Sequence, residues 1–127
     1  MACKSILVVD DDAHVRRTLA AILSQAGYRV ATAGFVCDAI ESLVNDCFDL
    51  VFLDLKMPDM EGLALLSKLH IVFPKLPVLI LTGHPGMGYV DGTERFEAQG
   101  YFLKPVDPAQ LLVCVKEILS EPEALRS

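Results

Sequence analysis

Residues 50–62 read LVFLDLKMPDMEG. The first four residues are apolar, which is typical of a strand buried on both faces of a parallel sheet. Asp54 ends this strand as an acid, a residue type that is rarely buried in a core. Pro58 cannot lie in a central strand, and Gly62 suits a sharp turn or the start of a helix. The stretch therefore predicts a buried strand that delivers Asp54 to the edge where α/β sheets place their chemistry.

Strand-like and helix-like segments alternate along the rest of the chain. Short runs rich in apolar and β-branched residues predict four further strands, at residues 5–9, 28–33, 78–81 and 101–103. Apolar residues at helical spacing predict helices between Asp12 and Gly27, at 38–45, at 62–72, and from Asp107 or Pro108 onward. Short connections between parallel strands cross over right-handedly, so the order of elements predicts a parallel sheet with helices on both faces.

Two of the helices have distinctive ends or interiors. Asp11 or Asp12 is expected to cap the first helix, Gly27 to stop it, and Arg16 to lie on its polar side. Another helix is expected within residues 84–100, where the glycines at positions 86, 88 and 92 each cost about 1 kcal/mol relative to alanine. That helix is therefore predicted to be short, to start late or to be mobile.

Composition limits the class of protein. A chain of 127 residues suits one domain, and a hydrophobic share of 53% suits fully buried strands. The net charge of −6 argues against direct binding to nucleic acid or to an anionic membrane. No apolar run approaches the roughly 18 residues that cross a membrane, and the N-terminus lacks a signal-peptide core. The four cysteines form no CxxC pair, which favours reduced thiols in a cytoplasmic protein.

Polar side chains follow four of the five predicted strands. They are Asp10 and Asp11 after the first strand, Asp54 after the third, Thr82 after the fourth and Lys104 after the fifth. Because the carboxyl ends of parallel strands meet at one edge of a sheet, we expect these groups to converge.

Such a cluster has electrostatic and chemical consequences. Two unit charges about 4 Å apart repel by about 4 kcal/mol at an effective dielectric of about 20, so three clustered acids call for a cation or a bound proton. Few oxygen ligands with room for water suit Mg²⁺ better than Ca²⁺. A carboxylate that can attack phosphorus, beside a metal, a hydroxyl and an ammonium group, is also what phosphoryl transfer requires.

The chain resembles the receiver domain of two-component response regulators over nearly its whole length. The resemblance lies in ILVVDD at residues 6–11, DLKMPDMEG at 54–62, LTG at 81–83 and KP at 104–105. It implies a flavodoxin-like, doubly wound sheet of five parallel strands in the order 2-1-3-4-5. Residues 1–120 would form the receiver domain, and 121–127 a polar tail or the start of a linker.

The resemblance also implies roles for the acids. Asp54 would be the phosphoacceptor, taking a phosphoryl group from a histidine kinase or a histidine phosphotransfer protein. Asp11, Asp54 and the backbone carbonyl of Lys56 would bind Mg²⁺ directly, and Asp10 would act mostly through a bound water. Such a domain is not a conventional enzyme, and catalyses only its own slow phosphorylation and dephosphorylation.

Further residues would read out the phosphorylated state. By resemblance, Thr82 would hydrogen-bond the phosphoryl group, Lys104 would pair with it, and Tyr101 would turn inward behind Thr82. Lys56 and His84 occupy positions that border the phosphoryl group and tune its hydrolysis. The change would remodel the face made by the helix expected within 84–100, the strand 101–103 and the last helix, and so control an output domain or partner, including a homodimer formed on phosphorylation.

Two other classes of function compete with this interpretation. A phosphohydrolase could use Asp54 as a nucleophile, but such enzymes usually carry a general acid two residues further on, where this chain has Lys56. A flavin- or nucleotide-binding module could share the topology. The segment 83–88 is glycine-rich but does not form GxGxxG, and the chain contains no P-loop.

Overall fold

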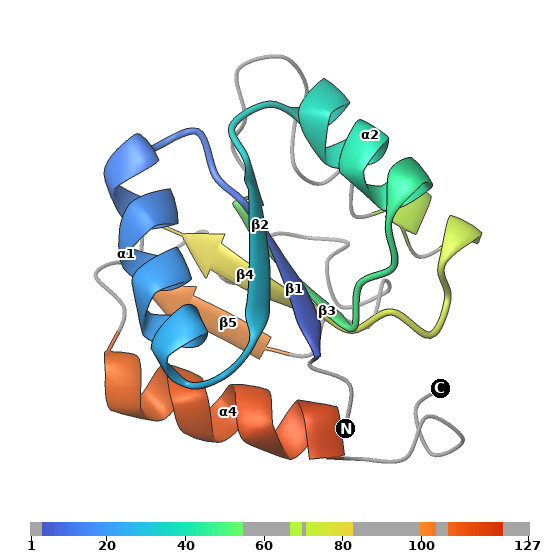
Figure 1. The fold of residues 1–127 in the computed structure, drawn as a ribbon. Helices are drawn as coiled ribbons and strands as arrows, with labels where there is room; N and C mark the ends of the chain where they lie inside the picture. Colours follow the sequence, from blue (N-terminus) through green and yellow to red (C-terminus); the bar gives the residue numbers. More distant parts are fainter. Residues whose placement is uncertain (1–3, 55–66, 70, 83–99, 104–106, 121–127) are drawn as a thin grey trace.

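A computed structural model describes residues 4–54, 67–69, 71–82, 100–103 and 107–120. Its elements follow one another as β1 (Ser5–Val9), α1 (Ala13–Gln25), β2 (Arg29–Ala33), α2 (Val36–Asn45), β3 (Leu50–Asp54), β4 (Val78–Thr82), β5 (Gly100–Leu103) and α4 (Pro108–Ser120) (Figure 1). Residues 67–69 and 71–72 are also helical, in agreement with the helix predicted at 62–72. The helix expected within 84–100 lies outside the described residues.

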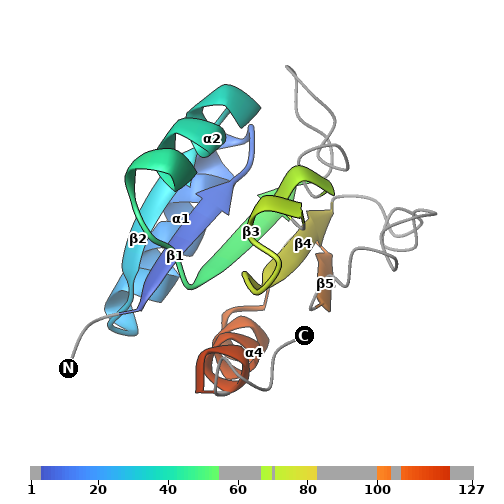
Figure 2. The ribbon, with the colours of Figure 1, turned by 90° about the vertical axis from the view of Figure 1, so that its right-hand side faces the viewer.

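The five strands form one parallel sheet in the order β2-β1-β3-β4-β5. Figure 2 shows β2 and β5 at its two edges, with β1, β3 and β4 between them. In the register, Val9 of β1 lies opposite Leu53 of β3, and Asp54 lies opposite Leu81 of β4. The predicted fold class and strand order are therefore confirmed, and the carboxyl ends of the strands lie at one edge.

Alternating residues along the strands build a separate core on each face of the sheet. One core joins the sheet to α2 and to Leu69, and contains Leu7, Val9, Ala33, Val36, Ala39, Leu43, Val51, Leu53, Val78 and Ile80. The other joins it to α1 and α4, and contains Ile6, Val8, Leu19, Leu23, Leu50, Phe52, Leu79, Leu81, Leu111, Val115, Ile118 and Leu119. Helices thus cover both faces of the sheet, as predicted (Figure 1).

The ends of α1 follow from local chemistry. The side chain of Asp12 accepts a hydrogen bond from the backbone N–H of His14 at 2.9 Å, so Asp12 is the cap. At the other end Gly27 has φ +100°, a left-handed conformation that glycine adopts without a steric penalty. The N–H of Tyr28 still bonds back to the carbonyl of Leu23, so β2 begins at Arg29 and not at Tyr28 as predicted.

The structure shifts the ends of three other elements. α2 begins at Val36, two residues before the predicted start, because the side chain of Val36 is buried in the core beside the sheet. Phe35 at the cap position offers no side-chain hydrogen bond, so no capping signal marks this start. β4 extends to Thr82 and β5 begins at Gly100, each one residue beyond the predicted strand.

Candidate functional site

The loop after β1 is anchored around Asp10. The N–H of Asp10 donates to the carbonyl of Ala33 at 3.0 Å, which continues the pairing of β1 with β2 by one residue. The Asp10 Oδ1 atom accepts a hydrogen bond from the N–H of Asp12 at 2.9 Å, while Asp12 itself caps α1. Asp10 is also fully buried. These contacts hold it at the carboxyl edge of the sheet, between the end of a strand and the start of a helix.

Asp10, Asp11 and Asp54 form one acidic cluster. Each offers a carboxylate oxygen, and these oxygens all lie within 4.8 Å of one another. Asp10 and Asp54 are buried, with 0% and 6% of their surfaces exposed, whereas Asp11 is exposed. The cluster forms because β1 and β3 are neighbours in register, so that the residues after Val9 and Leu53 emerge side by side.

The cluster has the chemistry of a hard-cation site. The buried carboxylates of Asp10 and Asp54, with oxygens within 4.8 Å of each other, repel by about 3.5 kcal/mol at an effective dielectric of about 20, and water screens the pairs that involve the exposed Asp11. A small divalent cation with oxygen ligands removes that repulsion, and three carboxylates that leave room for water match the ligand set of Mg²⁺. The exposed Asp11 leaves the cluster open to solvent on one side.

The other predicted site residues are placed only in part. Thr82 ends β4 one residue beyond the pairing of Leu81 with Asp54, and so lies at the same edge as the acidic cluster. Tyr101 lies in β5, opposite Ile80. The side chains of both residues lie outside the described part of the structure. Lys56, His84 and Lys104 also lie outside the described residues, and Lys104 directly follows the end of β5 at Leu103.

Arg16 contacts the backbone of the loop that carries Asp10, although the sequence indicates only a polar helix face. Its Nη1 atom donates a hydrogen bond to the backbone carbonyl of Asp10 at 2.7 Å. The sequence feature that points to this contact is the position of Arg16 near the start of α1. From there, a long side chain can reach back to the loop that precedes the helix. The sequence does not specify that direction, because Arg16 could equally extend into solvent.

Comparison with known proteins identifies the family. Residues 6–116 match the model of the response regulator receiver domain. The chain belongs to this family. Among curated relatives of the receiver domain, the transcriptional regulatory protein ZraR of Klebsiella oxytoca is 36% identical over 91% of the chain, and AlgB, the alginate biosynthesis transcriptional regulatory protein of Pseudomonas putida, is 34% identical over 94%. The chain spans only 26% and 28% of the lengths of these two relatives.

Solved structures of receiver domains share the fold. A CheY-like receiver domain from Methanospirillum hungatei is 35% identical with a TM-score of 0.87, covering 93% of this chain and 94% of that one. The response regulator TrrA of Thermotoga maritima, solved in complex with Mg²⁺-BeF, is 29% identical with a TM-score of 0.82, covering 91% and 99%. Within the described part of the receiver domain, no helix is long and apolar enough to cross a membrane.

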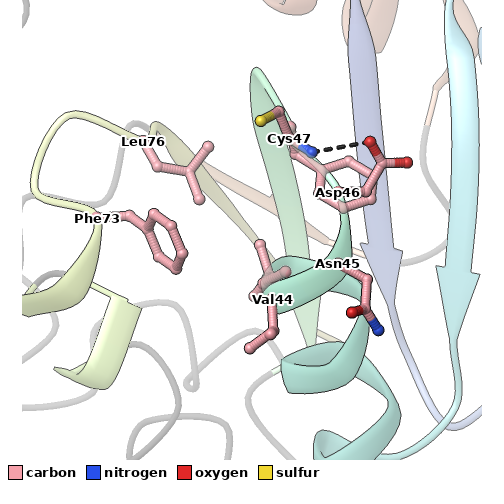
Figure 3. A pocket seen from close by; sticks show the side chains of 8 residues that line it. Val44, Asn45, Asp46, Cys47, Phe73 and Leu76 are labelled. Atoms are coloured by element: carbon pink, nitrogen blue, oxygen red, sulfur yellow. Dashed lines mark hydrogen bonds between the residues drawn. The ribbon is translucent and has the colours of Figure 1, made fainter.

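A hollow lies at the opposite end of β3 from the acidic cluster. Residues of α2, of the segment before β3 and of the segment before β4 line it (Figure 3), namely Leu43, Val44, Asn45, Asp46, Cys47, Phe48, Phe73 and Leu76. Its lining is mostly apolar, and the carboxylate of Asp46 accepts a hydrogen bond from the N–H of Cys47. Among the described residues that line this hollow, Asp46 is the one acid, in contrast to the grouped carboxylates at the carboxyl edge of the sheet.

Proposed function

We propose that this receiver domain is a phosphoacceptor in a two-component phosphorelay, and that Asp54 takes the phosphoryl group. The donor would be a histidine kinase or a histidine phosphotransfer protein. The observation that carries the proposal is the placement of Asp54. It ends a central strand, is almost fully buried, and has a carboxylate oxygen within 4.8 Å of those of Asp10 and Asp11. A lone acid at a strand end would not have this setting.

Asp10, Asp11 and Asp54 would hold Mg²⁺, together with the backbone carbonyl of Lys56. Support for the metal comes from the donor set of the cluster, and from the related TrrA protein, which was crystallised with Mg²⁺-BeF. When bound, Mg²⁺ would neutralise the oxygens of the incoming phosphoryl group. The buried Asp10 would orient the site, and the exposed Asp11 would leave a path for the donor.

In this reaction the protein mainly positions the reacting groups and places opposite charges near the phosphoryl oxygens. An oxygen of the Asp54 carboxylate bonds to phosphorus as the bond from phosphorus to the donor imidazole nitrogen breaks, and the imidazole takes a proton from solvent. Thr82 and Lys104 would hold the transferred phosphoryl oxygens through a hydroxyl and an ammonium group. Lys56 and His84 would border the product and set how fast water removes it.

The output would follow from a shift between two arrangements of the receiver domain. A phosphoryl group adds about −1.5 to −2 charge by analogy with other phosphorylated side chains. Thr82 would move toward it and Tyr101 would turn inward, which alters the face that includes β5 and α4. Moving an equilibrium from 1:99 to 99:1 needs about 5.5 kcal/mol, which a few charge-assisted hydrogen bonds can supply. ZraR and AlgB are transcriptional regulatory proteins, which supports control of an output domain or partner.

Incubation with a small phosphodonor and Mg²⁺, followed by intact mass measurement, tests the proposal. The wild-type protein should gain one phosphoryl group, and Asp54→Asn should gain none. Asp46→Asn is a matched control, because Asp46 is an exposed acid at the end of α2 and lies outside the acidic cluster. Equal gain by Asp54→Asn and the wild type would show that Asp54 is not the acceptor.

A further inference from the structure

We propose that Arg16 is a positioning residue that fixes the acidic loop after β1, and that Gly34 leaves the space its guanidinium group needs. Neither residue belongs to the set of carboxylates, hydroxyl and lysine to which a role is given above. The inference rests on the proposed function only in taking Mg²⁺ as the cation that the loop serves.

The contact joins a charged donor to the backbone of the loop. Arg16 lies in the first turns of α1, is half-buried, and donates from Nη1 to the carbonyl oxygen of Asp10 at 2.7 Å. A hydrogen bond from a charged donor is shorter and about twice as strong as a neutral one. The guanidinium of Arg16 therefore links the helix that follows the loop to the strand that precedes it.

This carbonyl controls the direction of the next residue. The carbonyl of Asp10 and the N–H of Asp11 belong to one rigid peptide plane, so holding the oxygen fixes how the chain enters Asp11. The N–H of Asp10 and its Oδ1 atom are already held by Ala33 and Asp12. Arg16 supplies the anchor that acts on Asp11, the exposed member of the cluster, which has no burial in the core to hold it.

The absence of a side chain at Gly34 leaves the space that the Arg16 guanidinium occupies. A Cβ atom added at Gly34, directly after β2, would lie 2.7 Å from Nη1 and 3.2 Å from Cζ of Arg16. Among the described glycines, Gly27 is the one with positive φ, so alanine at position 34 meets no left-handed strain. The atoms it would strike are the end of a flexible side chain. Gly34→Ala should therefore displace the guanidinium and leave the fold and the charge intact.

The direction of the change in Mg²⁺ affinity distinguishes a positioning role for Arg16 from the effect of its charge alone. Arg16 is a cation near a proposed cation site, so its charge alone opposes Mg²⁺, and removing it would tighten Mg²⁺ binding. If Arg16 holds the ligand loop in place, its removal weakens binding, by about tenfold as is usual for groups that orient metal ligands. Gly34→Ala keeps the charge and tests position alone.

The experiment compares Mg²⁺ affinities, measured by titration calorimetry, for Arg16→Met, Gly34→Ala and the double variant. Arg17→Met is the matched control, because Arg17 is the exposed neighbour and its loss changes the net charge equally. We expect each single variant to bind Mg²⁺ about tenfold more weakly, the double variant to lose no more than either, and Arg17→Met to match the wild type. Without metal, the melting temperatures of Arg16→Met and Gly34→Ala should fall by several degrees through the lost hydrogen bond, which leaves both variants folded at the temperature of the titration.

A metal-free readout accompanies the titration. Hydrogen exchange at the amide of Asp12, which donates to Asp10, should be faster in Arg16→Met and in Gly34→Ala than in the wild type. Unchanged exchange, Mg²⁺ binding by Arg16→Met as tight as or tighter than wild type, or additive losses in the double variant would each overturn the inference. Failure of the wild type to accept phosphoryl groups would instead refute the role of Asp54, and would leave both readouts on Arg16 valid.

Discussion

Replacing Asp54 by asparagine should stabilise the metal-free protein. The carboxylate oxygens of Asp54 and Asp10 are both buried and lie within 4.8 Å of each other, which corresponds to about 3.5 kcal/mol of repulsion at an effective dielectric of about 20. The pair with the exposed Asp11 is screened by water and adds less. Asparagine has nearly the same shape and no charge. We therefore expect the free energy of unfolding to rise by about 1–3 kcal/mol, part of the repulsion being lost to local relaxation.

Urea unfolding in the presence of EDTA measures this effect. The midpoint should rise in Asp54→Asn with an unchanged slope, and the melting temperature should rise by about 4 °C per kcal/mol for a domain of this size. Added Mg²⁺ should stabilise the wild type more than the variant, since the variant has lost one ligand. The control Asp46→Asn should change stability by less than about 0.5 kcal/mol. An Asp54→Asn protein no more stable than wild type in EDTA would mean that the carboxylates do not repel one another as the geometry implies.

Four further predictions concern the scaffold. Phe52→Ala, in the fully buried middle of β3, should lower the free energy of unfolding by about 3–5 kcal/mol in urea titration. Asp12→Ala removes the cap of α1 and should cost about 1 kcal/mol, measured by the same titration. Burial and then the Glu117 carboxylate raise the pKa of the Cys114 thiol, so iodoacetamide should label Cys114 more slowly than the exposed Cys47, read by peptide mass. Because folding raises this pKa, the folded protein holds the thiol proton more tightly than the unfolded chain does. The free energy of unfolding should therefore fall as the pH rises above the ordinary pKa of a cysteine thiol.

Much of the fold follows from local patterns in the sequence. The continuous apolar runs of β1, β3 and β4 are visible without a structure because both faces of these strands are buried. The place of Asp54 at the end of β3 follows from the change from apolar to polar residues at that point. The strand order came from the family resemblance, since the alternation of strands and helices is compatible with several orders.

Other features depend on contacts that the local sequence does not encode. Val36 extends α2 because it packs against the sheet, and no capping residue marks that earlier start. The contact of Arg16 with Asp10 depends on the space beside Gly34, which belongs to a different connection of the fold. A long side chain on a helix can take many directions, and only the packing of α1 beside β2 selects this one. The roles of all the predicted site residues remain predictions, namely those of Asp10, Asp11, Asp54, Lys56, Thr82, His84, Tyr101 and Lys104.

Mapping the phosphorylated residue would show directly whether Asp54 is the phosphoacceptor. The wild-type protein would be phosphorylated by a small phosphodonor with Mg²⁺, the acyl phosphate reduced with labelled borohydride, and the labelled residue located by peptide sequencing. The acidic cluster predicts that the label falls on Asp54 alone, and that Asp54→Asn carries none. Label on Asp10 or Asp11, or equal label in Asp54→Asn, would show that Asp54 is not the acceptor.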